Sequence, residues 1–217
     1  MMLYLFRHGK SHANTARLVT GTPADTLVDE GRRQAEAMRG WIDQVNLNAD
    51  RFFTSTWQRA QQTARLIFPR AEWRIDARLG ETDAGSVAQW QLAEFVARHP
   101  QFYGDNATPY PGGESHEDLN RRVMNWLDEL LTQHAADARI VVVAHSGPIA
   151  CLVQHALGIG MERFPALLPA HASLTIIEYS GNGADVNADA SALQATLKGF
   201  SLTPAEFAAP MLNPTRQ

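Results

Sequence analysis

The chain has 217 residues, 45% of them hydrophobic and 19% charged, which is typical of a globular protein and long enough for one substantial α/β domain. The net charge of −4 argues against nucleic acid or an acidic membrane as a partner, because both need a broad basic surface, but it permits a small anionic substrate. A single cysteine, Cys151, excludes an internal disulfide, and no stretch has the length of a signal-peptide core or a bilayer span, so we expect a cytoplasmic protein.

The first half of the chain predicts two strands, each followed by a helix. The apolar run 3–6 indicates a buried strand that ends in a polar, glycine-containing loop. Apolar residues at helical spacing predict a helix over 29–45. Residues 51–54 form the second strand candidate, and we expect Ser55 or Thr56 to cap the helix that follows it.

The second half repeats this alternation of strands and helices. Ser115 to Asp118 fits a capping box that opens a long amphipathic helix. Residues 140–144 lack polar alternation and predict a central strand covered on both faces, followed by a helix that begins near Pro148 and stops at Gly158. A strand, a polar connection and an edge strand complete the predicted elements: residues 174–179, 180–192 and 195–200.

This order of elements predicts the α/β class, with a three-layer α/β/α architecture around an open, mainly parallel central sheet. An antiparallel strand at the sheet edge is also compatible with it. We expect one domain over residues 1–217, with a small helical cap inserted around 86–110 over the site. Ligands of such sheets bind at the carboxyl ends of the strands, and His8 and His145 both follow predicted strands.

Several polar residues at strand ends and helix starts suit the transfer of a phosphoryl group. Neutral imidazole is a nucleophile near pH 7, arginine binds phosphate oxygens through two parallel hydrogen bonds, and an acid must protonate the leaving alcohol. The chain offers these groups and further donors: Arg7, His8, Ser11, Asn14, Arg59, Glu81 and His145. Other carboxylates near the candidate acid are alternatives to it: Glu72, Asp76, Asp83 and Glu94. None of these residues decides the function alone.

Six segments follow one another in an order that resembles a known family. They are Arg7-His8-Gly9 with Ser11 and Asn14, Gly31 with Gln34-Ala35, Ser55 with Arg59-Ala60 and Thr63-Ala64, Glu81 with Gly85, Pro111 to Ser115 with Arg122-Val123, and Val143 to Gly147. Together they resemble the histidine phosphatase superfamily, the phosphoglycerate-mutase-like proteins. The resemblance runs from about residue 3 to residue 179. Arg-His-Gly alone is weak, whereas six segments in order are strong.

The resemblance implies a role for each matching residue. His8 is expected to be the nucleophile that becomes transiently phosphorylated, and Glu81 the acid that protonates the leaving alcohol and then activates water. Four residues are expected to bind the phosphoryl oxygens, His145 as a positively charged donor: Arg7, Asn14, Arg59 and His145. Ser11 and Gly21 are further candidates for substrate binding. No metal and no other cofactor is expected, because the arginines and His145 supply the positive charge. Three positions depart from the family's pattern: Lys10, Val28 and Gly80.

We therefore expect a metal-independent phosphomonoester hydrolase, a phosphatase that acts on a small phosphorylated metabolite through a phosphohistidine. The alternatives are a phosphoglycerate mutase-type transfer and a catalytically inactive, phosphate-binding regulatory module. The loop 80–85 lacks the pattern of the family's mutases and only residues 86–110 follow it before the Pro-Gly-Gly segment, which favours hydrolysis. The sequence leaves open the physiological substrate, the oligomeric state and the role of residues 180–217.

Overall fold

The computed structural model describes residues 1–181 and 194–204, and within them six strands form one sheet of order β3-β2-β4-β1-β5-β6. The strands are β1 (Met2–Arg7), β2 (Arg51–Thr54), β3 (Trp73–Ile75), β4 (Arg139–Ala144), β5 (Leu174–Ser180) and β6 (Gln194–Leu202). Strands β3, β2, β4 and β1 are parallel, β5 is antiparallel to β1, and β6 is antiparallel to β5. The predicted α/β class and mainly parallel sheet are thus confirmed, with two strands rather than one completing the antiparallel edge.

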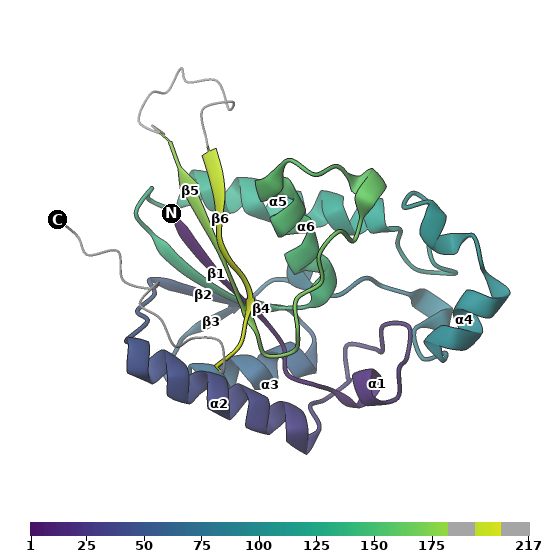
Figure 1. Ribbon diagram of the computed structural model, residues 1–217, viewed down its shortest axis with the longest axis horizontal. Coiled ribbons are helices and arrows are strands. Elements are labelled where there is room, and N and C mark those ends of the chain that lie inside the picture. Colours follow the sequence, from purple (N-terminus) through teal and green to yellow (C-terminus); the bar gives the residue numbers. More distant parts are fainter. Residues whose placement is uncertain (182–193, 205–217) are drawn as a thin grey trace.

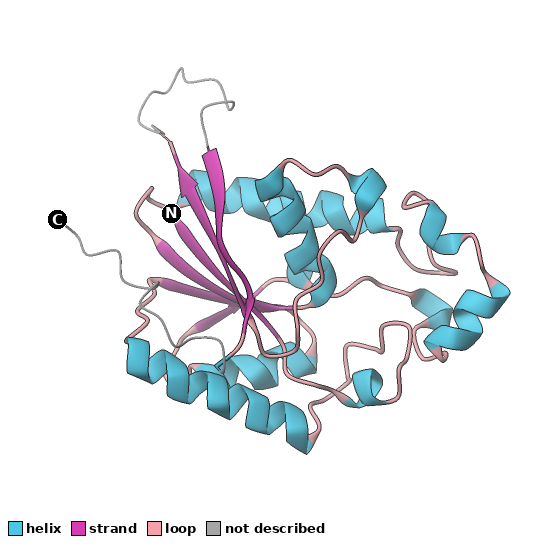
Figure 2. Cartoon of the chain, viewed as in Figure 1, coloured by secondary structure: helices cyan, strands magenta, loops and turns pink. Residues whose placement is uncertain are grey.

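Helices cover both faces of this sheet (Figures 1 and 2). The longer ones are α2 (Asp29–Val45), α3 (Gln58–Ile67), α5 (His116–Gln133) and α6 (Ser146–Leu157). Short helices and 3₁₀ turns lie mainly in the connections: α1 (His12–Thr15), η1 (Ala77–Leu79), η2 (Gly85–Val87), α4 (Leu92–Arg98), η3 (Phe102–Gly104) and η4 (Met161–Arg163). No helix in the described ranges is both long and apolar enough to cross a membrane.

The two-residue period of β1 divides the core between the two helical layers. Leu3 and Leu5 pack into the cluster of α5 and α6, whereas Tyr4 and Phe6 pack into the cluster of α2 and α3. Strand β4 alternates in the same way and is buried along nearly its whole length. Alternate side chains of a strand point to opposite faces, so an unbroken apolar run is what a strand between two helical layers requires.

The helix boundaries confirm most of the predicted signals. Ser115 forms the capping box of α5, and Gly158 ends α6 with a φ of +65°. The prediction that Ser55 or Thr56 caps α3 is wrong, because Trp57 occupies the N-cap position and no side chain makes a capping hydrogen bond there. Ser55 instead accepts a hydrogen bond from the Trp57 amide and contacts His145. Strand β3 was not predicted, since it has three residues and two of them are exposed.

A small helical segment lies beyond the carboxyl ends of the parallel strands, around α4 in Figure 1. It has an apolar cluster of its own, formed by Ala84, Val87, Ala88, Phe95, Phe102 and Tyr110. This segment lies where the sequence predicts a cap, and the division of the chain into domains stays a prediction. The predicted connection over 180–192 falls, from residue 182 on, outside the described residues, as does the chain after residue 204.

The backbones of two glycines meet where the loop after β1 passes the start of α2. A Cβ at Gly9 would lie 2.4 Å from the Gly31 carbonyl oxygen, and one at Gly31 would lie 2.0 Å from the Lys10 carbonyl oxygen. Neither distance is compatible with a side chain. The contact therefore requires glycine at both positions and sets how closely α2 approaches the loop that carries His8.

We expect Gly31→Ala to lower the free energy of unfolding by about 1–3 kcal/mol, because the added methyl group must push the loop away from α2. Gly40→Ala in the same helix is the matched control, since nothing lies within 4 Å of the added Cβ. It should raise the free energy of unfolding by about 0.5–1 kcal/mol through lower backbone entropy in the unfolded chain. Urea unfolding of both variants measures the difference. An unchanged free energy of unfolding in Gly31→Ala would contradict the close contact.

Candidate active site

A cavity of about 260 Å³ lies at the carboxyl ends of β1 and β4, under the cap. Five of the predicted site residues line it: Arg7, His8, Asn14, Arg59 and Glu81. His145 is fully buried, and its ring centroid lies 4.9 Å from that of His8. The structure thus brings together six residues that are spread over most of the sequence, as expected for the carboxyl edge of a parallel sheet.

His8 is held in one orientation and one tautomer. Its Nδ1 lies 2.7 Å from the Gly9 carbonyl oxygen, which can only accept a hydrogen bond, so Nδ1 carries the proton. The Nε2 atom accepts a hydrogen bond of 3.0 Å from Nε of Arg59. An Nε2 that accepts has a free electron pair, which is the requirement for a nucleophilic nitrogen.

The surroundings of His8 keep its imidazole neutral. Burial is the main cause that holds the pKa of His8 well below its ordinary value of 6.5, and the nearby Arg59, His145 and Arg7 reinforce it, while the bond to Gly9 opposes it. The loop after β1 is also fixed, because the Gly9 amide donates to Thr63 of α3. His8 therefore presents an unprotonated nitrogen at neutral pH without movement of its backbone.

Arg59 is a buried cation that is held by contacts with three protein side chains. Its Nη1 lies 3.0 Å from Oδ2 of Asp25, its Nε donates to His8, and its guanidinium carbon lies 4.4 Å from the ring centroid of Trp57. Burial lowers the pKa of Arg59, while Glu81 and Asp25 oppose that shift. Asp25 in turn accepts from the amide of Ala13, which ties Arg59 to the loop that carries Asn14.

Arg7 has no carboxylate partner at contact distance among the residues that the structure describes. Its Nη1 donates to the Pro169 carbonyl oxygen at 2.6 Å, and its Nε is buried without a hydrogen-bond partner among the described residues. Burial lowers the pKa of Arg7 to about 10, with Glu81 opposing and Arg59 reinforcing the shift. Arg7 is therefore still charged at neutral pH, and its free donor is suited to an anionic oxygen.

His145 differs from the expected cation. Its Nε2 lies 2.8 Å from Oγ of Ser55, and that hydroxyl already accepts from the Trp57 amide. The hydroxyl proton has no other acceptor in the described part of the chain, so it points to Nε2 and leaves the proton of His145 on Nδ1. Burial, together with Arg59, Arg7 and Arg122, holds the pKa of His145 well below 6.5. At neutral pH it is a neutral donor through Nδ1, which has no protein partner in the described ranges.

Glu81 is positioned by the first turn of α6 and by its own loop. Its Oε2 accepts from the Ser146 hydroxyl at 3.0 Å and from the Gly147 amide at 3.4 Å, while Oε1 accepts from the Thr82 amide. A Cβ at Gly147 would lie 2.3 Å from Oε1. Gly147 therefore makes the room in which the carboxylate lies against the helix.

An ion pair from the Pro-Gly-Gly segment holds the loop of Glu81. Arg122 of α5 donates through two nitrogens to the carboxylate of Glu114, at 3.0 and 2.6 Å. The same guanidinium donates to the carbonyl oxygens of Arg78 and Glu81, and Glu114 accepts from the amide of Asp83. The matching segment around Glu114 and Arg122 thus positions the candidate acid without lining the cavity.

Three predicted binding residues have different surroundings from one another. Asn14 lines the cavity, and its Oδ1 accepts from both the amide and the hydroxyl of Ser11, which directs its amide nitrogen away from Ser11. Ser11 is fully buried as the cap of α1 and does not line the cavity. Gly21 does not line it either; its φ of +74° and a Cβ position 2.5 Å from Ala13 require glycine there.

Several functional neighbours were not predicted from the sequence. Asp25, Ser55 and Ser146 orient Arg59, His145 and Glu81, respectively. Ser55 and Ser146 lie within matched segments but were given no role there, and Asp25 lies outside these segments. His171 lies with its ring centroid 5.8 Å from that of His8, and its Nε2 is buried and unpartnered within the described chain. Burial, Arg7 and Lys10 lower the pKa of His171 to about 4. It lies in an irregular segment that shows no helical or strand pattern.

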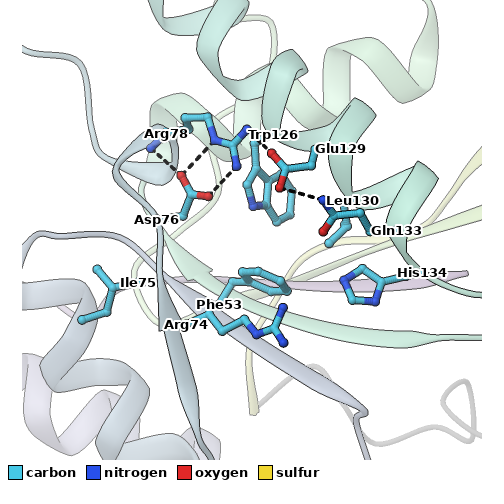
Figure 3. A pocket seen from close by; sticks show the side chains of 10 residues that line it. All are labelled: Phe53, Arg74, Ile75, Asp76, Arg78, Trp126, Glu129, Leu130, Gln133 and His134. Atoms are coloured by element: carbon cyan, nitrogen blue, oxygen red, sulfur yellow. Dashed lines mark hydrogen bonds and ion pairs between the residues drawn. The ribbon is translucent and has the colours of Figure 1, made fainter.

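A second cavity, between β3, η1 and α5, has different chemistry (Figure 3). Its Arg78 lies 2.7 Å from Asp76 and 2.7 Å from Glu129, so its charge is already matched by carboxylates. His134 also lines this cavity, where its ring lies edge-on to that of Phe53, with the centroids 6.3 Å apart. Nor do the described residues include a group of three or more His, Cys, Asp or Glu side chains arranged to hold a metal. The cavity around His8 is therefore the candidate active site.

Comparison with known proteins gives consistent matches. A profile of the histidine phosphatase superfamily (branch 1) matches residues 3–190. Human 6-phosphofructo-2-kinase/fructose-2,6-bisphosphatase 4 is 29% identical over 181 residues, which cover 80% of this chain and 37% of the human protein. An uncharacterized protein of Mycobacterium bovis is 32% identical over 84% of this chain and 51% of its own length. The chain thus spans about a third to a half of these relatives.

Solved structures match over nearly the whole of both chains. A mycobacterial glucosyl-3-phosphoglycerate phosphatase in complex with VO3 has a TM-score of 0.79 at 26% identity, covering 93% of this chain and 99% of its own. A structure described as mycobacterial hydrolase 1 has a TM-score of 0.80 at 25% identity, with the same coverage. The fold described above is therefore the fold of these proteins.

The lowered pKa values of His8 and His145 predict that the free energy of unfolding falls with falling pH. Unfolded histidines take up protons below 6.5 while the native imidazoles stay neutral, so acid favours the unfolded chain. We expect a loss of about 1.4 kcal/mol per pH unit for each imidazole between 6.5 and its native pKa. Urea unfolding of wild type and His145→Gln from pH 7 to 5 measures it. His155→Gln, at an exposed position of α6, is the control, and an unchanged slope in His145→Gln would contradict the assignment.

Proposed function

The chain belongs to the histidine phosphatase superfamily, branch 1, and we propose that it is a metal-independent phosphomonoesterase that uses His8 as its nucleophile. The observation that carries this proposal is a neutral His8 whose Nε2 accepts from Arg59, with a second arginine, the half-buried Arg7, in the same cavity. Glu81 lines the same cavity and is fixed by hydrogen bonds. Nucleophile, anion clamp and acid are the parts that phosphoryl transfer needs.

In the first step, the Nε–H of Arg59 is released from Nε2 of His8 and donates to a phosphoryl oxygen. The Nε2 electron pair then attacks phosphorus, and the bond from phosphorus to the alcohol oxygen breaks. The leaving oxygen takes a proton from Glu81, so the alcohol departs neutral. Arg7, Arg59 and Nδ1 of His145 donate to the phosphoryl oxygens, on which negative charge is spread in the transition state. Asn14 adds its amide N–H groups. Nδ1 of His8 keeps its proton and its bond to Gly9, so the phosphohistidine is a cation at the ring and an anion at the phosphoryl group.

In the second step, water attacks the phosphorus of phosphohistidine and gives a proton to the carboxylate of Glu81. The nitrogen–phosphorus bond breaks, the electron pair returns to Nε2, and inorganic phosphate leaves. Glu81 ends the cycle protonated, as it began. The phosphoryl charge that the metal ion balances in many phosphotransferases is balanced here by Arg7 and Arg59, which is why no metal enters either step.

The names of the relatives support hydrolysis over transfer to a second hydroxyl. The human relative includes a fructose-2,6-bisphosphatase, and the mycobacterial structure is that of a glucosyl-3-phosphoglycerate phosphatase. Both names describe release of phosphate. The loop Gly80 to Gly85, which departs from the mutase pattern, points the same way. We take the substrate to be a small phosphorylated metabolite.

We expect His8→Ala to lose at least about 10⁴-fold in kcat toward p-nitrophenyl phosphate, because no other group can form the covalent intermediate. The wild-type rate should be unchanged in EDTA. Urea unfolding of the variant checks that the fold persists. Acid-quenched wild type incubated with labelled substrate should carry label on a histidine, and label on another residue type, or full activity in His8→Ala, would exclude this nucleophile.

Glu81→Gln should slow alkyl phosphates by about 10²–10⁴-fold and p-nitrophenyl phosphate much less, because p-nitrophenolate leaves without a proton. Steady-state kcat values for the two classes give the comparison. Asp83→Asn in the same loop is the control, since Asp83 does not line the cavity around His8. Equal losses for both substrate classes would assign the proton to a different group.

A further inference from the structure

We propose that the site selects phosphomonoesters whose alcohol part is apolar or aromatic and carries no second anionic group. The inference rests on the proposed function, and it concerns the part of the cavity that the phosphoryl group does not fill. That part is bounded by six side chains, called the apolar wall here: Leu18, Val19, Tyr103, Tyr110, Phe164 and Leu168. They come from the loop after α1, from the cap and from the segment after α6.

Both positively charged side chains of the cavity are paired with the phosphoryl group in the proposed mechanism. Arg7 and Arg59 are the only lysine or arginine residues that line the cavity in the described part of the chain, and the proposed mechanism uses both of them. His116 also lines it, but its Nδ1 lies 2.9 Å from Oδ1 of Asn106 and burial lowers its pKa below 6.5, so it is neutral at neutral pH. A carboxylate or second phosphate placed against the apolar wall would have no cation to pair with, and an unpaired buried charge is strongly unfavourable.

The carboxylate of Glu81 adds to this selection. It lines the same cavity and accepts from the amides of Thr82 and Gly147. Once it has given a proton to the leaving oxygen, it is an anion beside the departing alcohol. An alcohol with a negative charge would then be held against a like charge, whereas a neutral alcohol would not.

Three of the six side chains of the apolar wall are aromatic rings, which suit a flat ligand. The ring of Tyr103 stacks on that of His116 with an interplanar angle of 19°. The ring of Phe164 also packs against His116, with the two centroids 5.2 Å apart. The hydroxyl groups of Tyr103 and Tyr110 contact each other at 3.1 Å, so one hydroxyl hydrogen of the pair is already used. Tyr103 is 43% exposed and Leu168 is 56% exposed, which leaves apolar surface at the mouth of the cavity for a ligand to cover.

The test compares benzyl phosphate with 4-carboxybenzyl phosphate, because the two alcohols differ in charge and hardly in leaving ability. We expect kcat/KM to be roughly tenfold or more higher for benzyl phosphate, and glycerol 3-phosphate to fall well below it as well. Benzylphosphonate and 4-carboxybenzylphosphonate are compared by calorimetry, which measures binding without turnover. The expected ratio of affinities has the same direction.

Two variants separate charge at the wall from general effects. Leu168→Arg places a cation at the wall and should reduce the preference for the uncharged ligand, in both kcat/KM and affinity. Ile75→Arg is the matched control, because Ile75 is also 56% exposed but lies on β3, beside the other cavity. It should leave the ratio unchanged. A change of equal size in both variants would show that only the net charge of the protein matters, and would overturn the inference.

The outcomes also distinguish this inference from the proposed function. Hydrolysis of p-nitrophenyl phosphate that depends on His8, combined with equal use of the charged and uncharged benzyl compounds, would sink the inference and leave the function standing. If p-nitrophenyl phosphate is not hydrolysed at all, the function fails, and the phosphonate affinities still decide the inference. Tighter binding of the carboxylated phosphonate to wild type would overturn it in either case.

Discussion

The buried guanidinium of Arg59 and the half-buried one of Arg7 lie beside a neutral histidine, and among the described residues only Arg59 has a carboxylate, that of Asp25, at contact distance. Removing such charges from water is costly, so the fold must hold Arg7 and Arg59 by other means. A backbone carbonyl from the segment after α6 fixes Arg7, while Asp25 and the ring of Trp57 fix Arg59. The result is a positive potential that is in place before any ligand arrives, the arrangement that stabilises a phosphoryl transition state without reorganisation.

The same two arginines also affect the protonation of His8 and His145. Their charge adds to burial in keeping His8 and His145 neutral, so a stronger anion clamp also makes a more available nucleophile. Hydrogen bonds then choose the tautomers: the Gly9 carbonyl oxygen fixes the proton of His8, and the Ser55 hydroxyl fixes that of His145. Burial and charge therefore keep each ring neutral, and hydrogen bonds determine which nitrogen of each ring carries the proton.

The sequence predicts the sheet and its long helices well because these elements depend on local periodicity and caps. Ser115 and Gly158 work as their residue types indicate. Long-range partners are different: Ser55 is a reasonable cap by local rules, yet its hydroxyl is used by His145, which is 90 residues away. The charge expected for His145 is not what the free site favours, because a pKa depends on burial and on Arg59 and Arg7, which only the fold brings close. Asp25 and His171 left no local signal at all.

The apolar clusters of the cap and of the sheet have no buried residue in common. Phe95 and Phe102 pack within the cap, whereas the side chains of β1 and β4 pack between the sheet and its two helical layers. Substitutions in the cap can therefore alter which alcohol fits without opening voids beneath the nucleophile. In evolutionary terms, the two parts are free to change at different rates: the catalytic end is constrained by charge and tautomer, and the cap is constrained mainly by volume. A scaffold divided in this way can acquire new substrates through a few substitutions while its chemistry is inherited intact.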